Sequence, residues 1–215
     1  MNRRHFNAWL LAAPLLGSGA AAASAAEPRR LLILGDSLSA EYGLRRGSGW
    51  AALLQQRLDA EQPGWQVINA SISGDTSSGG RSRLPALLQQ HRPALVVIEL
   101  GGNDALRGLP LEMTRANLGE MARAARASGA RVLLLGMQMP PNYGARYAAE
   151  FRQLYADVAR AEKAALLPFF LAGVADAPDA AALFQADRIH PNEAAQPRML
   201  DKVWEGGLRR LFNAR

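Results

Sequence analysis

The sequence predicts an α/β fold in which a parallel sheet is covered by helices on both faces. Four short runs are continuously apolar rather than alternating, which is typical of strands buried on both sides. Between these runs, apolar residues recur every three or four positions, which is the period of helices packed on a core. Alternation of strands and helices along one chain favours a doubly wound parallel sheet.

The predicted elements follow one another without an internal repeat or a domain linker. The candidate strands are residues 31–34, 67–70, 95–98 and 132–135, with 166–170 as a candidate fifth strand. The clearest helical stripes run over residues 50–58, 151–158 and 200–211. We expect each stripe to belong to the core rather than to a binding site.

The first 26 residues have the pattern of an export signal rather than of a folded element. Arg3 and Arg4 precede an apolar run, and small residues follow in an A-x-A pattern that ends at Ala25. Glycine and serine interrupt the apolar run, which disfavours a retained membrane anchor. We therefore expect cleavage near Ala25 or Ala26 and one domain over residues 27–215, in the periplasm or secreted. The general secretory route and the twin-arginine route both remain open.

The composition excludes several classes of function. The chain has no cysteine, so it carries no disulfide, no thiol nucleophile and no zinc–thiolate site. The formal net charge is +6, but the arginines are dispersed, so we expect no nucleic-acid partner. The glycine patterns of dinucleotide sites and phosphate-binding loops are absent, and so is G-x-S-x-G. We expect no cofactor and no metal.

Polar residues follow each predicted strand at the point where it ends. Ser37 follows the first strand, Gly74 the second and Asn103 the third, while Asp187 and His190 lie near the C-terminus. In parallel sheets the ligand lies outside the carboxyl ends of the strands. We therefore expect these five residues to converge on one edge of the sheet.

This set of residues is suited to acyl transfer. A serine hydroxyl needs an adjacent base, and His190, with Asp187 three positions before it, is the candidate. His91 is predicted at the opposite end of the sheet, where a helix ends. The backbone N–H groups of Ser37 and Gly74 and the side-chain amide of Asn103 are candidate oxyanion donors.

Each of these motifs alone is more often an ordinary turn than a site. Their joint occurrence after separate elements, in one order and on one predicted edge, predicts a serine hydrolase. We interpret Asp36, Asp75 and Asp104 as residues that brace the loops. Glu99 lies inside a predicted strand and requires a partner there if it is buried.

The chain resembles the SGNH (GDSL) hydrolases, and most closely their thioesterase I, lysophospholipase and arylesterase branch. The blocks that carry this resemblance are LLILGDSLSAEYG (31–43), VINASISGDTSSGGRSRLPALLQQH (67–91), ELGGNDALRG (99–108), MPPNYG (139–144), LLPFF (166–170) and DRIHPNEAAQP (187–197). Together they span nearly the whole chain after residue 30.

The resemblance implies a three-layer, flavodoxin-like fold with a five-stranded parallel sheet, and a cofactor-free esterase. It implies Ser37 as nucleophile, His190 as base and Asp187 as the residue that orients it, with Ser37, Gly74 and Asn103 as the oxyanion hole. The branch favours glycine where this chain has Glu41, which would place a negative charge near the entrance to the site.

The predicted substrate is a small-molecule acyl or aryl ester or thioester, cleaved by a monomer. The candidate residues for an acyl groove are Leu106, Leu109, Met139, Pro140 and Tyr143, and loop packing explains them equally well. A carbohydrate O-deacetylase would use the same catalytic residues. A non-catalytic binding protein and a metal phosphoesterase are the alternatives from other classes.

Overall fold

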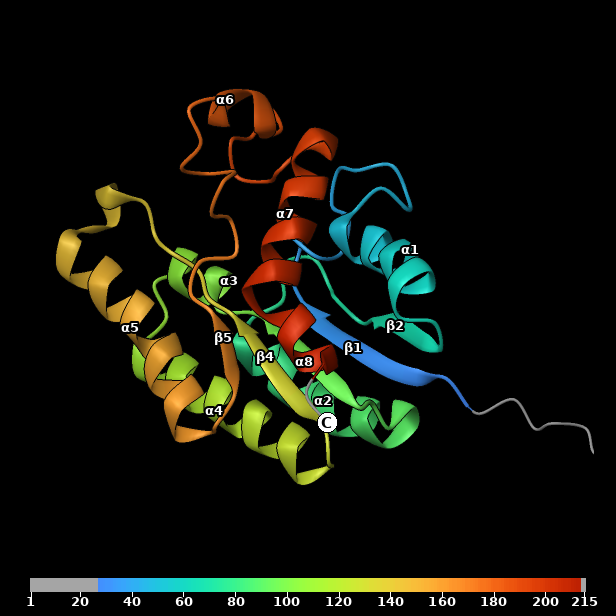
Figure 1. Cartoon of the computed structure of the whole chain (residues 1–215). Helices are drawn as coiled ribbons and strands as arrows, with labels where there is room; N and C mark the ends of the chain where they lie inside the picture. Colours follow the sequence, from blue (N-terminus) through green and yellow to red (C-terminus); the bar gives the residue numbers. More distant parts are fainter. Residues whose placement is uncertain (1–26, 214–215) are drawn as a thin grey trace, which may run out of the picture.

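The computed structural model describes residues 27–213, and Figure 1 shows a parallel sheet with helices on both sides. The strand order is β2-β1-β3-β4-β5, and every neighbouring pair is parallel. The strands are β1 (Arg29–Gly35), β2 (Trp65–Asn69), β3 (Leu95–Glu99), β4 (Arg131–Leu135) and β5 (Ala165–Leu167). The predicted fold class is confirmed. The predicted export signal, residues 1–26, lies outside the described residues.

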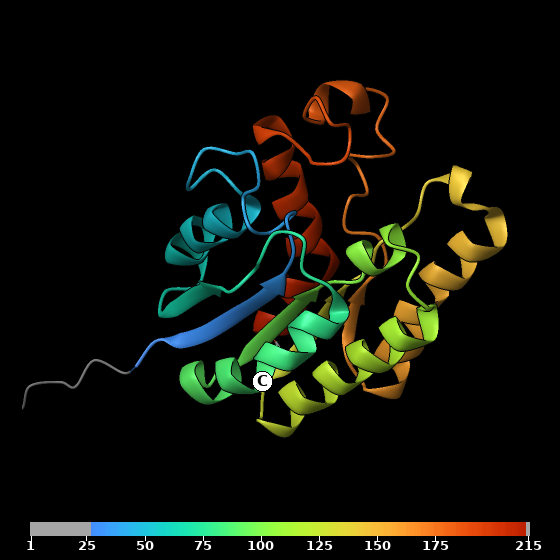
Figure 2. The same ribbon diagram turned by 180° about the vertical axis from the view of Figure 1, so that it is seen from behind.

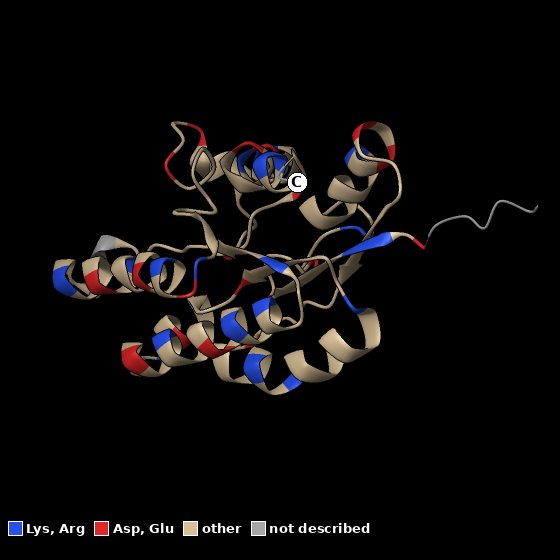
Figure 3. Ribbon diagram, turned by 60° about the horizontal axis from the view of Figure 1, so that its bottom comes forward, with Lys and Arg blue, Asp and Glu red and all other residues tan. Residues whose placement is uncertain are grey.

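The three central strands are apolar and buried over most of their length because both faces of the sheet are covered there, whereas the edge strand β2 has exposed Gln66 and Asn69. Along β1, Leu31 and Ile33 belong to one core and Leu32 and Leu34 to the other, and all four are fully buried. Figures 2 and 3 show the two helical layers on either side of the sheet. One layer contains α1 (Trp50–Glu61), α7 (Gln196–Val203) and α8 (Arg209–Asn213). The other contains α2 (Ser77–His91), α4 (Leu111–Ala127) and α5 (Ala145–Ala161).

The fifth strand is shorter than the sequence predicts. It ends at Leu167, because Pro168 has no N–H with which to extend the ladder. The prediction of strand through residue 170 is therefore wrong beyond Leu167. Phe170 instead donates its N–H to the carbonyl of Gly136 and buries its ring in the core.

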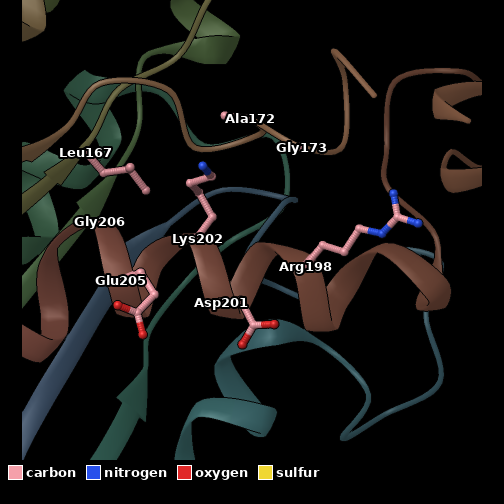
Figure 4. Close-up of a pocket in the computed structure, with 8 residues that line it drawn as sticks. All are labelled: Leu167, Ala172, Gly173, Arg198, Asp201, Lys202, Glu205 and Gly206. Atoms are coloured by element: carbon pink, nitrogen blue, oxygen red, sulfur yellow. The ribbon is translucent and has the colours of Figure 1, made fainter. Parts of the chain in front are cut away.

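The C-terminal stripe is not one regular helix as predicted. A π-helical turn, η3 (Trp204–Leu208), separates α7 from α8. A Cβ on Gly206 would lie 2.6 Å from Leu167, and a Cβ on Gly207 would lie 2.7 Å from Leu133. Figure 4 shows Gly206 beside Leu167. The two glycines let the wide turn approach the sheet closely at this point.

The remaining short elements lie in loops near the carboxyl ends of the strands. They are α3 (Gly102–Leu106), η1 (Pro141–Tyr143), α6 (Ala180–Leu183) and η2 (Glu193–Ala195). The charged residues are distributed over the helices of both layers without a block of one sign (Figure 3). No helix between residues 27 and 213 is long and apolar enough to cross a membrane.

Two buried glycines should respond oppositely to the same substitution. A Cβ on Gly136 would lie 2.5 Å from the carbonyl oxygen of Pro168, and backbone cannot move aside cheaply. We expect Gly136→Ala to lower the free energy of unfolding by about 1–3 kcal/mol. Gly119 lies inside α4, and a Cβ there would lie 3.9 Å from Oε1 of Glu162, so Gly119→Ala should raise the free energy of unfolding by up to about 1 kcal/mol. Urea unfolding measures both, and equal stabilities would contradict the packing at Gly136.

Candidate active site

A tight turn presents Ser37 at the end of β1. The N–H groups of Ser39 and Ala40 both donate to the carbonyl of Asp36, at 3.2 and 2.9 Å. A Cβ on Gly35 would lie 2.8 Å from Oε2 of Glu99, so a larger residue does not fit below the turn. Asp36 is buried, whereas Ser37 is half-buried at the end of the sheet.

Ser37, His190 and Asp187 form one chain of hydrogen bonds. Nε2 of His190 lies 2.9 Å from Oγ of Ser37, and Nδ1 lies 2.7 Å from Oδ2 of Asp187. The other oxygen of Asp187 accepts the backbone N–H groups of Ile189 and His190, at 2.9 and 3.0 Å. Arg188 has a positive φ of 58°, which closes this turn around the carboxylate. The structure thus brings together three residues that the sequence analysis singled out.

The charge on Asp187 determines which ring nitrogen of His190 carries the proton. The backbone N–H of His190, then its side chain and the N–H of Ile189, lower the pKa of Asp187 to about 2. Asp187 is therefore ionised near neutral pH and requires a proton on Nδ1 of His190. That tautomer leaves Nε2 as the acceptor for the hydroxyl proton of Ser37.

Two unused backbone donors lie on the loops that follow β1 and β2. Within residues 27–213, the N–H groups of Ser37 and Gly74 donate to no protein acceptor. Gly74 has a φ of +79°, a conformation that favours glycine. The guanidinium of Arg107 donates to the carbonyl of Gly74 at 2.8 Å and so fixes the adjoining peptide. Both N–H groups are available to an anionic ligand.

The amide of Asn103 bridges these two loops. Its Nδ2 donates to Oδ2 of Asp36 at 3.0 Å and to the carbonyl of Asp75 at 2.9 Å. Asp36 precedes Ser37 and Asp75 follows Gly74, so the two hydrogen bonds hold the Asn103 amide next to the residues that carry the unused N–H groups. Both hydrogens of the amide are engaged, and a third acceptor would have to share one of them.

Beneath Ser37 lies a buried pair of acids, Asp36 and Glu99. Oε2 of Glu99 accepts from Oγ of Ser39 at 2.8 Å and from the N–H of Asp36 at 3.3 Å. The Ser39 hydroxyl also accepts from Nε1 of Trp50 at 3.1 Å. The other oxygen of Glu99 has no partner within residues 27–213. Ser39 is thus the side-chain partner that the sequence could not identify for Glu99.

Burial is the main influence on both acids. It raises the pKa of Asp36 to about 6, although the N–H of Leu38, His190 and Asn103 act in the opposite direction. It raises the pKa of Glu99 well above its usual range, and the negative charge of Asp36 adds to that effect. Burial thus shifts both carboxyl groups toward their protonated forms, although a pKa of about 6 still leaves most of Asp36 ionised at pH 7.

The other acidic residues singled out from the sequence make bracing contacts. Asp75 forms an ion pair with Arg83 at 2.8 Å. Arg83 also donates to the carbonyls of Ala70 and Gly35, so it joins the loops that follow β1 and β2. Asp104 is fully buried and accepts the N–H of Ser77 at 2.8 Å.

The five residues proposed for an acyl groove differ in exposure. Leu106 is 48% exposed and Tyr143 is 38% exposed, while Pro140 is exposed and Leu109 is half-buried. Met139 is buried in the core beside α5, and it borders a cavity of about 270 Å³ together with residues of that helix. The contacts of Met139 therefore favour packing, whereas Leu106 and Tyr143 remain open to a ligand.

The loop after β1 contains two features that the sequence did not reveal. The carboxylate of Glu41 accepts the N–H groups of Gly47 at 3.0 Å and of Gly49 at 2.8 Å, just before α1. Backbone donors therefore hold this carboxylate in place at the start of α1, and the negative charge expected near the entrance to the site stays a prediction. Glu41 has a φ of 59°, which explains why glycine suits this position. The next residue, Tyr42, packs its ring against His190 at 4.4 Å between ring centroids.

A separate open cavity of about 600 Å³ lies between β5 and α7 (Figure 4). Three of its charged lining residues form ion pairs, namely Arg198 with Asp179, Asp201 with Arg57, and Glu205 with Arg209. Neither Ser37 nor His190 lines it. Among residues 27–213, no group of three or more His, Asp or Glu side chains is arranged to hold a metal ion.

Comparisons with known proteins agree on one family. Residues 33–197 match the sequence model of the GDSL-like lipase/acylhydrolase family. Esterase TesA of Pseudomonas aeruginosa is 57% identical over 179 residues, which are 83% of this chain and 88% of that protein. A crystal structure of TesA, also 57% identical, superposes with a TM-score of 0.79 over 83% of this chain and 97% of its own.

Two further relatives carry other activity names. Thioesterase 1/protease 1/lysophospholipase L1 of Escherichia coli is 45% identical over 177 residues, which are 82% of each chain. Arylesterase of Vibrio mimicus is 43% identical over 183 residues, which are 85% of this chain and 89% of that protein.

The buried acid pair should make stability depend on pH. Native Asp36 binds its proton more tightly than the unfolded carboxyl group does, so its contribution to stability is largest at low pH. That contribution is lost as the pH rises through about 6. We expect Asp36→Asn to reduce the fall in unfolding free energy between about pH 4 and about pH 7 by on the order of 2 kcal/mol.

Urea unfolding across this pH range measures the effect. Asp179→Asn is the control, because this exposed carboxylate pairs with Arg198 and its pKa is lowered, so it stays ionised throughout the range. Identical pH slopes for the wild type and Asp36→Asn would contradict the raised pKa of Asp36.

Proposed function

The chain belongs to the GDSL-like lipase/acylhydrolase family and is a carboxylic ester hydrolase, and we propose that it cleaves acyl and aryl esters and thioesters through an acyl-enzyme on Ser37. One observation carries the assignment of the nucleophile. Oγ of Ser37 lies 2.9 Å from Nε2 of His190, whose Nδ1 lies 2.7 Å from an ionised Asp187.

In the proposed acylation, Nε2 of His190 accepts the proton of Ser37 as Oγ attacks the carbonyl carbon of the ester. The tetrahedral intermediate collapses when the imidazolium gives this proton to the departing alcohol or thiol. Water then repeats the sequence on the acyl-enzyme: His190 takes a proton from the water and returns one to Oγ. Asp187 holds the imidazole in the required tautomer and stabilises its charged form.

The proposed oxyanion hole consists of the N–H groups of Ser37 and Gly74 and the amide of Asn103. Among residues 27–213 the two backbone donors find no protein acceptor, and they can point at a developing negative charge. Asn103 can contribute by sharing one hydrogen that it now gives to Asp36 or to the carbonyl of Asp75. Its hydrogen bond to a buried carboxyl group keeps the amide nitrogen, rather than its oxygen, on that side.

The breadth of the proposed substrate range follows from the relatives. At 43–57% identity over most of the chain, their names include esterase, arylesterase, thioesterase and lysophospholipase. The shared requirement is an acyl carbonyl with a leaving alcohol or thiol. Leu106 and Tyr143 are exposed apolar side chains on loops after β3 and β4, and they support contact with an acyl chain.

We also propose that residues 1–26 direct export and that the mature chain is a monomer in the periplasm or outside the cell. The support for export is the order of basic, apolar and small residues in that segment. A single domain with its own two-sided core is compatible with a monomer.

Kinetic profiling over a p-nitrophenyl ester chain-length series, acyl-CoA, lysophospholipid and an acetylated sugar tests the proposed function. Turnover confined to the acetylated sugar would overturn it in favour of a deacetylase.

Ser37→Ala should lower kcat on the order of 10⁶-fold and abolish labelling by a fluorophosphonate. Ser78→Ala, an exposed serine in the first turn of α2, is the matched control and should change neither. Retained turnover by Ser37→Ala would identify a different nucleophile.

The role of Asn103 can be separated from its bridging contacts. We expect Asn103→Ala to lower kcat by about 10²–10³-fold with a small change in KM, because an oxyanion donor acts in the transition state. Arg83→Ala also loosens the loops after β1 and β2 but removes no oxyanion donor, so it should cost less in kcat for the same loss of stability. An unchanged kcat for Asn103→Ala would make Asn103 a structural residue only.

A further inference from the structure

The side chain of Tyr42 occupies an unusual position for an aromatic residue. It is 50% exposed, and few large apolar side chains among residues 27–213 are exposed to this degree. Its ring nevertheless contacts the imidazole of His190, with centroids 4.4 Å apart and planes inclined by 41°. No hydrogen bond involves its hydroxyl group within the described residues. The contact is therefore one of ring against ring.

Gln185 holds both sides of this contact. Its Nε2 donates to the carbonyl of Tyr42 at 2.8 Å and to the carbonyl of Pro191 at 3.2 Å. Its backbone N–H donates to the carbonyl of His190 at 2.8 Å. One residue thus anchors the backbone on which each of the two rings is mounted.

The residue after Tyr42 is Gly43, and its missing side chain leaves space for the amide of Gln185. Gly43 has a φ of +70°, and a Cβ there would collide with the amide of Gln185. The anchor therefore requires glycine at position 43 for both conformation and space. A loop built in this way fixes the position of the Tyr42 ring rather than leaving it free on the surface.

We propose that Tyr42 is a positioning residue for the general base, whose ring face orients the His190 imidazole and stabilises its protonated form. The proposal rests on the proposed function, in which His190 becomes an imidazolium during each half-reaction. Aromatic rings attract cations that lie over the ring face within about 6 Å of its centroid, and the 4.4 Å between the two ring centroids lies inside this limit. The attraction is absent while the imidazole is neutral, so it favours the transition state over the resting state.

Other charged groups near His190 also affect its protonated form, and the contribution of Tyr42 has to be compared with theirs. Asp187 is hydrogen-bonded to Nδ1, and the buried carboxyl of Asp36 interacts electrostatically with the ring. Arg188 is exposed two positions before His190, and Glu41, beside Tyr42, is bound by Gly47 and Gly49. Beside these two acidic groups, the half-exposed neutral ring of Tyr42 contributes a modest further interaction.

The test is the pH–rate profile of kcat/KM for p-nitrophenyl acetate, whose short acyl chain limits other contacts with Tyr42. For Tyr42→Leu we expect a two- to fivefold lower plateau, about the size of a cation–π contact at an exposed site. The acid limb should move about half a pH unit to lower pH, because the protonated form has lost a stabilising partner. Tyr42→Phe keeps the ring and should match the wild type in both respects.

Tyr42→Trp gives a result in the opposite direction and does not depend on the leucine variant folding. A larger aromatic face should move the acid limb to higher pH. A lower plateau with an unmoved limb in Tyr42→Leu would indicate packing alone and overturn the proposal. So would a Tyr42→Phe profile like that of Tyr42→Leu, or a change confined to KM. Failure of the wild type to label at Ser37 with a fluorophosphonate would instead overturn the proposed function itself.

Discussion

The hydrogen bond between Oγ of Ser37 and Nε2 of His190 joins two residues that are 153 positions apart in the chain. Much of the structure serves to keep these two atoms 2.9 Å apart. Ser37 is fixed by a turn at the end of a central strand. His190 is fixed by a short loop whose carboxylate accepts two of that loop's own N–H groups. Since neither segment can determine the separation alone, it depends on how the intervening elements pack.

The site retains features that reduce the stability of the fold. Asp36 and Glu99 are buried beneath the serine, and burial disfavours their charged forms. An apolar pair would pack there without this penalty. Asp36, however, also accepts the Asn103 amide, and its backbone carbonyl shapes the turn at Ser37. The polar groups therefore give the loops a defined geometry at some cost in stability.

The loop after β1 contributes more to the site than its serine. Glu41 closes the loop onto the start of α1, and the ring of Tyr42 contacts the imidazole of His190. Gln185, from the segment that carries His190, binds the same loop. Ser37 and His190 are thus linked twice, through their own hydrogen bond and through the contacts that Tyr42 and Gln185 make between their supporting loops.

The sequence by itself determined the fold class, the alternation of elements and the identity of the residues that would have to meet. Apolar runs and helical periods report burial locally, and a parallel sheet necessarily collects the loops after its strands at one edge. Local patterns failed where the outcome depends on a distant partner. The approach of Gly206 and Gly207 to the sheet widened the last helix, whereas Pro168 ended β5 for the local reason that it has no N–H.

Only the tertiary structure decided the partners of individual polar side chains. The deciding contacts join segments that are far apart in the sequence. They are the hydrogen bond of Ser39 with Glu99, the bridge of Asn103 between Asp36 and Asp75, and the ring contact of Tyr42 with His190. Such contacts leave no periodic signal, because a single hydrogen bond or ring contact requires one residue at one position. Periodicity records which face of an element is buried, whereas the chemistry of this site depends on separations of about 3 Å.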